Sequence, residues 1–403
     1  MNAVLVSHPH AAAFSTGLAS GLARAGKLAA FFTGVAVTER GWRSALVRRL
    51  SSRHPVLANR ILTGLPAETL RALPVVELAA RGAARWAPRL GLPLKRYDAL
   101  FVLHDRVVSR LPWPRETEAV YAYEDGALWT FQRAERLGLG RVWDLPLPHY
   151  RAIEQLWREE AERWPGAIDF APHAEPDWKK RRKDQELALA TKVSVASAFT
   201  KKSLDDLGIG KPTIVTPYGF PVDDFAPRSE RPKGKFTVLA VGTHDLRKGT
   251  PYLLEAWRRA AIPDAELHLV GPMRLAKGFL DRYAGLFKHR PHAPKSELGA
   301  LYAAADVLAF PTLGDGFGLV IQEAMCTGTP VITTPCGGGP ECIDDDVDGW
   351  LVPPRDIDAL VERLRACAAN RERTFGVGRS ARARAERWTW GDAERSLVSA
   401  LAL

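Results

Sequence analysis

The 403-residue chain has an ordinary globular composition, with 46% hydrophobic residues, 25% charged residues and a formal net charge of +10. This composition excludes disorder as the general state of the chain, and the length allows two or three domains with substantial cores. No stretch reaches the roughly 18 apolar residues of a membrane-spanning helix, and no secretory leader pattern opens the sequence, so we expect a cytoplasmic protein. The four cysteines lack the paired spacing of a metal site or a disulfide framework.

Alternating strand and helix signals begin the chain. A short apolar run centred on 3–6 predicts a strand, and a helix of small residues follows it. The apolar segments 97–105 (YDALFVLHD) and 118–123 (EAVYAY) predict two further strands, separated by a proline-containing loop. A strand at 141–144 then leads into a segment with helical spacing of its apolar residues. This order of elements indicates an α/β fold with parallel sheets.

Polar side chains stand where these strands end. His104 closes the predicted strand 97–105, and Glu124 and Asp125 follow the next strand. Because ligands bind at the carboxyl ends of parallel strands, these side chains are candidate ligand contacts. Each has a structural alternative: His104 can be a histidine with its hydrogen bonds satisfied at a strand end, and Asp125 can cap the following helix. His149 lies at the start of the next predicted helix and is a further candidate.

Two segments are rich in basic residues, an arginine-rich stretch at 40–60 and the run KKRRK at 179–183. One interpretation is that both are solvated faces. A second is that they bind anionic phospholipid or a polyanionic acceptor. Binding of nucleic acid is a third and weaker interpretation, because no nucleic-acid motif accompanies the charge.

Proline and glycine mark a domain boundary after a strand at 213–216, and we place the hinge at 219–235. The second domain opens with a strand, a glycine turn and an amphipathic helix. Arg247 and Lys248 stand directly before Gly249 in this turn, where two cations can neutralise an anionic ligand.

The most informative segment is 306–334. It predicts a buried strand at 306–310, a glycine-rich loop, a helix beginning near Leu319 and a strand at 331–334. Such a unit points a helix N-terminus, with its free N–H groups, at an anion such as a phosphate. Asp315 lies in the loop and Glu323 lies one to two turns into the helix, so the two carboxylates can hold different parts of one elongated ligand.

Residues 315–331 (DGFGLVIQEAMCTGTPV) resemble the signature E-x-F-G-L-V-x-x-E-A-M-A-x-G-x-P-V of retaining glycosyltransferases of family 4. Asp315 stands where a glutamate is usual, and Gly316 where proline is common. The resemblance implies the GT-B architecture, in which two Rossmann-like domains face each other across a cleft. It implies an acceptor-binding domain at 1–222, a donor-binding domain at 223–385, and a C-terminal helix at 386–403 that crosses back to the first domain.

The resemblance also implies roles for individual residues. Glu323 is expected to bond the ribose of a sugar nucleotide, Asp315 to hold hydroxyls of the donor sugar, and the N–H groups of 317–319 to face the sugar and diphosphate. The expected donor-binding residues are Gly242, Thr243, Arg247, Lys248, His292, Asp315, Gly316, Phe317, Gly318, Leu319 and Glu323. The expected catalytic residues are His104, Arg247, Lys248, Asp315 and Glu323, and the expected acceptor-binding residues are Glu124, Asp125 and His149.

The expected activity is transfer of a sugar from a nucleotide-diphosphate sugar to a hydroxyl of a glycan or lipid-linked acceptor, with retention of anomeric configuration. By family habit, the product belongs to cell-surface polysaccharide or glycolipid synthesis. Neither a metal nor a cofactor is expected, and the basic segments suggest peripheral contact with the inner face of an anionic membrane. Two other functions are compatible with the sequence: a nucleotide-sugar epimerase on the same fold, and a basic nucleic-acid or membrane-binding protein without catalysis.

Overall fold

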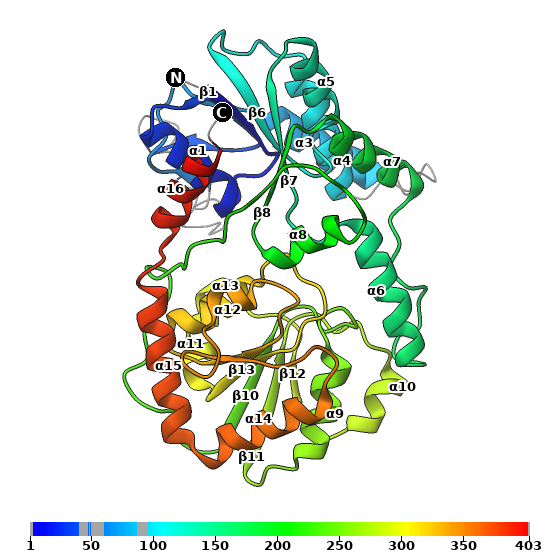
Figure 1. Ribbon diagram of the computed structural model, residues 1–403, viewed down its shortest axis with the longest axis vertical. Coiled ribbons are helices and arrows are strands. Elements are labelled where there is room, and N and C mark those ends of the chain that lie inside the picture. Colours follow the sequence, from blue (N-terminus) through cyan, green and yellow to red (C-terminus); the bar gives the residue numbers. More distant parts are fainter. Residues whose placement is uncertain (1–2, 40–46, 48, 50–59, 87–95, 402–403) are drawn as a thin grey trace.

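The computed structural model describes residues 3–39, 47, 49, 60–86 and 96–401, which form two lobes that each contain one parallel sheet (Figure 1). The first sheet has the order β5-β2-β1-β6-β7-β8-β9 and the second has the order β12-β11-β10-β13-β14-β15. The strands of the first sheet are β1 (Ala3–Ser7), β2 (Leu28–Thr33), β5 (Leu70–Ala72), β6 (Thr117–Tyr123), β7 (Gly140–Asp144), β8 (Lys192–Val195) and β9 (Thr213–Val215). Those of the second are β10 (Phe236–Val241), β11 (Ala265–Val270), β12 (Lys288–Arg290), β13 (Val307–Phe310), β14 (Val331–Thr333) and β15 (Trp350–Leu351). The short strands β3 (Val37–Thr38) and β4 (Ile61–Leu62) pair with each other.

Helices cover both faces of each sheet (Figure 1). In the first lobe they are α1 (Ala13–Arg24), α3 (Pro74–Trp86), α4 (Arg96–Val108), α5 (Leu128–Arg136), α6 (Tyr150–Arg163), α7 (Asp177–Leu189) and α8 (Ala198–Asp205). Later in the chain come α9 (Thr250–Ala260), α10 (Lys277–Leu280), α11 (Lys295–Ala304), α12 (Leu319–Cys326), α13 (Gly339–Cys342), α14 (Ile357–Ala369), α15 (Arg371–Ala385) and α16 (Trp390–Ala400).

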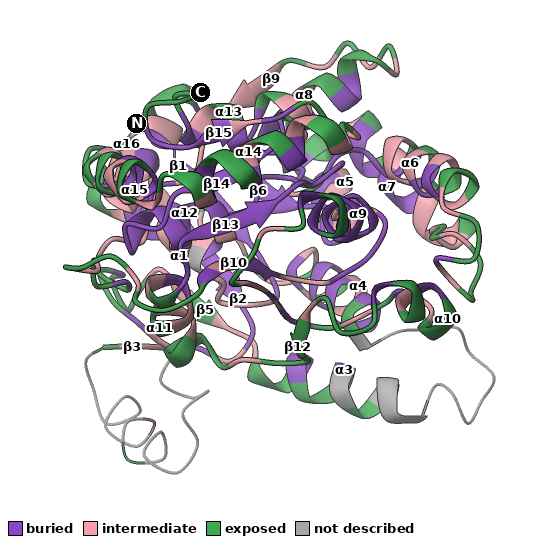
Figure 2. Cartoon of the chain, turned by 90° about the horizontal axis from the view of Figure 1, so that it is seen from below, coloured by how far each residue is buried: buried purple, intermediate pink, exposed green. Residues whose placement is uncertain are grey.

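The strands form the cores because their residues are apolar on both faces, as in parallel sheets covered by helices. All four residues of β13 are buried, and so are all five of β1. Figure 2 shows this as buried strands in the middle of the molecule, with exposed residues on the outer sides of α14 and α15. Helix α6 belongs to the first part of the chain, yet its Trp157 packs in the core of the second lobe.

The strand orders locate the switch points of the two sheets. In the first sheet, the connections run in opposite directions on either side of the β1/β6 pair, and in the second on either side of the β10/β13 pair. In open parallel sheets, ligands bind outside the carboxyl ends of the strands at such a point. The topology therefore directs attention to residues that directly follow β1, β6, β10 and β13.

The chain returns to the first lobe at its C-terminal end, as predicted. Helix α16 lies against α1 (Figure 1), and its Val398 packs in a core cluster of the first lobe. Phe220 N donates to Trp388 O at 2.8 Å where the two interdomain segments run side by side. A Cβ at Gly219 would lie 2.2 Å from the Thr389 carbonyl oxygen, so this crossing requires glycine.

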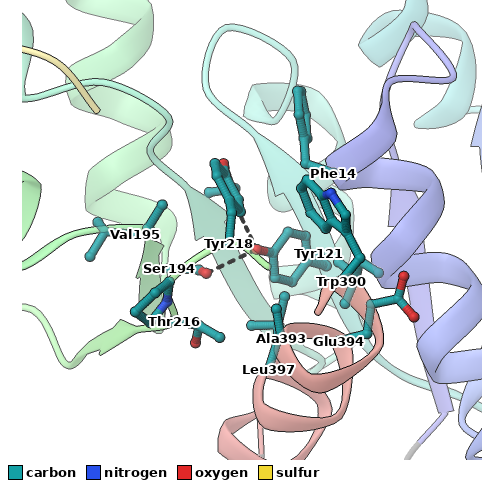
Figure 3. A pocket seen from close by; sticks show the side chains of 14 residues that line it. Phe14, Tyr121, Ser194, Val195, Thr216, Tyr218, Trp390, Ala393, Glu394 and Leu397 are labelled. Carbon is teal, nitrogen blue, oxygen red and sulfur yellow. Dashed lines mark hydrogen bonds between the residues drawn. The ribbon is translucent and has the colours of Figure 1, made fainter. Parts of the chain in front are cut away.

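Between α16 and the first sheet is a cavity of about 30 Å³, lined by aromatic rings and by residues of first-sheet strands (Figure 3). Tyr218 stacks on Trp390, with ring centroids 5.6 Å apart, and the Tyr121 hydroxyl donates to Ser194 Oγ at 2.9 Å. The cavity is too small for a sugar, so its packing serves to hold α16 on the first lobe.

One predicted strand is wrong. Residues 97–105 lie in α4, because the buried positions Leu100, Phe101, His104, Asp105 and Val108 follow the 3.6-residue period of one helix face. The other predicted strands of both domains are present, with ends that differ by one or two residues. The boundaries at 222/223 and 385/386 remain predictions. Within the described residues, no helix is both long enough and apolar enough to cross a membrane.

A buried carboxylate connects three elements of the first lobe and provides a stability test. Glu186, fully buried on α7, accepts from the backbone N–H groups of Asp125, Ala127 and Leu128 and pairs with Arg182 at 3.1 Å. We expect Glu186→Ala to lower the free energy of unfolding by about 3 to 5 kcal/mol, because it leaves buried donors unpaired. Urea unfolding followed by circular dichroism measures this. The exposed Glu162→Ala is the control, and an equal effect of the two substitutions would contradict the assignment.

Candidate active site

The loop between β13 and α12 is held in one conformation by its glycines. Gly318, directly before α12, has φ +88°, a left-handed conformation that favours glycine. The first N–H groups of α12 have no partner inside the helix, as at every helix N-terminus. They lie beside the β10/β13 switch point, where the sequence predicts the diphosphate of the ligand.

Asp315 and two cations meet at this switch point. The Lys248 ammonium forms an ion pair with Asp315 Oδ2, and Arg247 Nη1 lies 3.9 Å from Asp315 Oδ1. Arg247 Nη1 also donates to the Gly314 carbonyl oxygen at 2.6 Å. Burial lowers the pKa of Lys248, whereas the Asp315 carboxylate opposes that effect. An anion that replaced Asp315 as the partner of Lys248 would therefore find a cation that is poorly solvated and already oriented.

The turn that carries these cations packs tightly on the loop between β13 and α12, which is called the motif loop below. Gly249 has φ +68°, and a Cβ there would lie 1.9 Å from the Pro311 carbonyl oxygen. Only glycine fits this approach. This approach accounts for the glycine in the sequence R-K-G. Because residue 249 is glycine, its backbone can contact the loop after β13, and this contact brings Arg247 and Lys248 next to Asp315.

Glu323 is positioned by a residue that the sequence did not single out. The hydroxyl of Tyr302, a fully buried residue on α11, donates to Glu323 Oε2 at 2.7 Å. Burial raises the pKa of Glu323, and the hydrogen bond from Tyr302 opposes the rise. Nothing in the sequence near Tyr302 marks this contact, because Tyr302 and Glu323 are 21 positions apart. His292 is exposed, and its carbonyl oxygen accepts from Arg290 Nε at 3.0 Å.

If Glu323 bonds the ribose of a sugar nucleotide, as the resemblance implies, removal of this single hydroxyl should weaken binding of the nucleotide. We expect Tyr302→Phe to raise the Kd for the nucleotide about 5- to 10-fold, because Glu323 loses the hydrogen bond that orients it. Isothermal titration with the nucleoside diphosphate measures the change. Tyr252→Phe is a matched control, since Tyr252 also donates to a glutamate, Glu160, at 2.7 Å but packs against α6. Equal Kd values for wild type and Tyr302→Phe would show that Tyr302 does not position Glu323.

The first lobe closes directly on the motif loop. The Gly316 carbonyl oxygen accepts from Ser197 Oγ at 2.5 Å and from Thr200 Oγ1 at 3.2 Å, at the N-terminus of α8. Ala198 N in the same turn donates to Glu341 Oε1 of the second lobe at 2.6 Å. A Cβ at Gly316 would lie 1.7 Å from the Pro146 carbonyl oxygen. These contacts place the motif loop, which carries Asp315, between the two lobes.

The prediction that His104 lies at a strand end facing the cleft is wrong. His104 lies inside α4, is fully buried, and has its Nε2 atom 3.3 Å from Ser7 Oγ. Burial lowers its pKa to about 3. His104 is buried as a structural histidine would be, but the alternative is also wrong in placing it at a strand end, because it lies on a helix. The histidine that follows a strand is His8, directly after β1, whose ring packs on Tyr123 with centroids 4.6 Å apart; the short polar segment after the first strand was its signal.

Glu124 and Asp125 directly follow β6, as expected. Glu124 Oε1 lies 3.2 Å from Lys183 Nζ, and Asp125 Oδ2 lies 3.1 Å from Lys179 Nζ. Burial raises the pKa of Glu124 to about 7, although Lys183 lowers it. The alternative that Asp125 caps the next helix is wrong, because no side chain caps α5 at its N-cap residue and the N–H groups there are bonded by Glu186 and Asp105.

Both leading interpretations of the basic run 179–183 are wrong for most of its length. Lys179, Arg182 and Lys183 point into the first lobe, where Arg182 pairs with the fully buried Asp105. Their charges balance carboxylates inside the protein rather than form an outer basic surface. The other basic segment, at 40–60, lies largely outside the described residues. Arg60, the last residue of this segment, is described, and its Nη2 atom donates to Glu77 Oε1 at 3.0 Å.

The remaining predicted residues lie as follows. His149 is the N-cap residue of α6 and is buried, and its Nδ1 accepts from Arg151 N at 3.4 Å. Burial lowers the pKa of His149 to about 4. Gly242 and Thr243 follow β10, with Gly242 at φ +130°, and Phe317 and Leu319 lie on either side of Gly318. In the described part of the chain, no group of three or more His, Cys, Asp or Glu residues could hold a metal ion.

Comparison with known proteins finds a family that resembles part of the chain. Residues 235–370 match the family described as glycosyl transferases group 1. The D-inositol 3-phosphate glycosyltransferase of Arthrobacter sp. (strain FB24) is 28% identical over 288 residues, which cover 63% of this chain and 64% of that protein. The MMP alpha-(1->4)-mannosyltransferase of Mycolicibacterium hassiacum is 29% identical over 261 residues, which cover 61% of this chain and 60% of the relative. The chain thus spans less than two thirds of the length of these relatives.

Solved structures resemble the whole chain. Anabaena HepE, solved with UDP and glucose, superposes with a TM-score of 0.62 at 15% identity and covers 100% of both chains. Sucrose-phosphate synthase from Thermosynechococcus elongatus gives a TM-score of 0.65 at 18% identity, covering 99% of this chain and 98% of that chain. The fold is therefore the GT-B fold predicted from the sequence. Residues 235–370, within the second domain, are thus similar to the glycosyl transferases group 1 family.

Proposed function

We propose that this protein is a retaining glycosyltransferase that moves a sugar from a nucleotide-diphosphate sugar to a hydroxyl group of an acceptor. The observation that carries the proposal is the meeting of Arg247, Lys248 and Asp315 at the β10/β13 switch point, next to the N-terminus of α12. This set supplies positive charge for a diphosphate and a carboxylate for sugar hydroxyls. Glu323, one turn further into α12, bonds the ribose.

Donor binding rearranges the charges of this set. The diphosphate replaces Asp315 as the partner of Lys248, and the freed carboxylate accepts hydrogen bonds from hydroxyls of the donor sugar. As the bond between the anomeric carbon and the phosphate oxygen breaks, negative charge grows on that oxygen. Arg247, Lys248 and the N–H groups of α12 stabilise the charge, which is commonly the largest electrostatic contribution to catalysis.

The acceptor hydroxyl attacks the anomeric carbon on the face that the phosphate leaves, so the configuration is retained. Its oxygen forms the new bond, and its proton passes to the departing phosphate oxygen. No nucleophile from the protein is needed. The contacts of Ser197 and Thr200 with Gly316 hold the first lobe against the motif loop, which excludes water from the reacting atoms. Because two cations already face the diphosphate, we propose that the reaction requires no metal, and transfer should persist in EDTA.

The donor and acceptor are proposed at the level of chemical class. HepE was solved with UDP and glucose and with UDP-glucose, so UDP-sugars are the first donors to test. The name of the Arthrobacter relative points to a phosphorylated cyclic polyol as its substrate, whose hydroxyl groups resemble those of a sugar. We propose an acceptor of the glycan or lipid-linked class and a role in cell-surface polysaccharide or glycolipid synthesis, carried out in the cytoplasm or at the inner face of the membrane.

Thermal-shift measurement with UDP-, GDP- and ADP-sugars tests the donor site. A ligand at about 100 times its Kd stabilises the folded state by roughly 2.7 kcal/mol, which is enough to raise the Tm visibly. We expect one nucleotide class to raise the Tm of the wild type and not that of Glu323→Ala. The absence of any shift would contradict the proposal. Conversion of the donor sugar to its epimer without an acceptor would instead establish the epimerase on the same fold.

A further inference from the structure

An exposed aromatic ring lies beside the switch point of the first sheet. Tyr97, at the start of α4, is 54% exposed although it is a large aromatic residue. One side of its ring packs on the buried Phe101, with centroids 4.4 Å apart, and His10 lies 5.9 Å from it in the segment that follows β1. The ring is thus held by Phe101 and His10, and the described residues leave about half of the Tyr97 surface exposed. An immobilised open aromatic face is suited to stack on an apolar ligand face.

A cluster of buried charges lies next to this ring and contains more carboxylates than ammonium groups. Lys179 Nζ lies 2.9 Å from Asp98 and 3.4 Å from Glu175, and Lys183 Nζ lies 3.1 Å from Glu175. With Glu124 and Asp125, the two lysines therefore face four carboxylates. Lys179 links these carboxylates to the ring, because it pairs both with Asp98, the residue after Tyr97, and with Asp125. Burial and the Asp125 carboxylate raise the pKa of Tyr97 to about 12.

One carboxylate oxygen in this cluster lacks a hydrogen-bond donor. Asp125 is 7% exposed, and among the described residues its Oδ1 atom has no hydrogen-bond partner, whereas its Oδ2 atom pairs with Lys179. The Lys183 ammonium lies 3.9 Å from Oδ1, beyond hydrogen-bond distance. Asp125 also has φ +72°, an unusual conformation for a residue with a side chain. Buried polar atoms are normally bonded, so an unbonded acceptor here indicates a place for a donor from a ligand.

We propose that this surface is the acceptor subsite and that it binds an uncharged sugar ring, which stacks on Tyr97 and donates a hydroxyl hydrogen to Asp125. The inference rests on the proposed function, since it assumes that the first lobe holds the acceptor. Sugar hydroxyls are donors that match an unbonded carboxylate oxygen, and hydrogen bonds to charged groups are strong. A phosphorylated or carboxylated acceptor is disfavoured, because the surplus of carboxylates repels it.

Ligand titration by NMR, in the presence of saturating nucleoside diphosphate, tests the proposal at pH 8. The probes are methyl hexosides, the same hexosides carrying a 6-phosphate, and octyl hexosides. We expect at least one methyl hexoside to bind, with its 6-phosphate weaker by about 10-fold or more. Tighter binding of the octyl than of the methyl hexoside would indicate that the sugar belongs to a lipid-linked acceptor, and equal binding would indicate a free glycan. Both results leave a neutral sugar in the subsite.

Variants separate stacking from charge. Tyr97→Ala should weaken the methyl hexoside about 10-fold, whereas Tyr97→Phe, which keeps the ring, should bind it almost as the wild type does. Phe170→Ala is the control, since Phe170 is an exposed ring (42%) that packs near Trp157 instead. Asp125→Asn should reduce the discrimination against the 6-phosphate, an effect that a merely structural Asp125 would not produce.

Three outcomes would overturn the inference: no hexoside binds, the 6-phosphate binds as tightly as the neutral sugar, or Tyr97→Ala binds like the wild type. Failure of the proposed function has a different signature. In that case no nucleotide raises the Tm and Glu323→Ala changes nothing, whatever the hexosides do. A normal nucleotide shift with no hexoside binding therefore rejects the neutral-sugar subsite alone.

Discussion

Replacement of Lys248 by alanine is expected to lower kcat for sugar transfer by about 1000-fold, with a much smaller change in KM for the donor. The reason is that charge accumulates on the departing phosphate oxygen only as the glycosidic bond breaks. Lys248 is mostly buried and held beside Asp315, so its ammonium is oriented before the reaction and loses little solvation during it. Steady-state kinetics with the donor identified by thermal shift measures the effect.

Two further variants make this result specific. Lys288→Ala removes another lysine that pairs with a carboxylate in the second lobe, Glu266 at 2.6 Å, but from a mostly exposed position on β12. Its kinetics should equal those of the wild type. Lys248→Arg should recover only part of kcat, because a planar guanidinium cannot occupy the position of a compact ammonium. An unchanged kcat for Lys248→Ala would remove this cation from the mechanism.

The donor side of the fold could be predicted because its signals are local. The strand 307–310, the glycines of the loop and the helix beginning at Leu319 are adjacent in sequence, and each keeps its own periodicity or turn chemistry. The position of Lys248 next to Asp315 also follows from topology, because β10 and β13 are neighbours. What the sequence could not show is that Tyr302 supports Glu323, since nothing in a helix of small residues marks a hydroxyl with a distant partner.

The first domain was harder to predict because its decisive contacts join residues far apart in sequence. Lys179 reaches Asp98 across 81 positions, so a run that reads as a basic surface is in fact an internal counter-charge. Similarly, α4 reads as a strand when only its apolar content is considered. Its buried residues are spaced for a helix, and the correct period is clear only when His104 and Asp105 are counted with the buried face.

Contacts between the lobes explain why glycine, which departs from the family signature, occupies position 316. The sequence indicated only that glycine stands where proline is common. In the structure, a Cβ at this position would lie 1.7 Å from the Pro146 carbonyl oxygen and 2.8 Å from its carbonyl carbon, both backbone atoms of the first lobe. A side chain at position 316 therefore cannot coexist with the present approach of the lobes.

We accordingly expect Gly316→Ala to hold the lobes apart and to lower kcat/KM for transfer by about 100-fold, because a displacement of about 1 Å at a reacting centre has an effect of this size. Ser197 and Thr200 lose their contacts with the Gly316 carbonyl oxygen, and water enters the cleft. Donor binding should persist, since Glu323, Lys248 and α12 all belong to the second lobe. The ratio of donor hydrolysis to transfer should therefore rise, which steady-state assays with and without acceptor measure.

The matched control is Gly376→Ala, in which the added methyl group, within α15, meets no atom within 4 Å. It should leave both activities unchanged. Small-angle scattering with bound nucleotide separates closure from misfolding: Gly316→Ala should have a larger radius of gyration than the wild type but the same circular dichroism spectrum. Wild-type transfer by Gly316→Ala would show that the lobes need not approach this closely, and that glycine at this position does not serve closure.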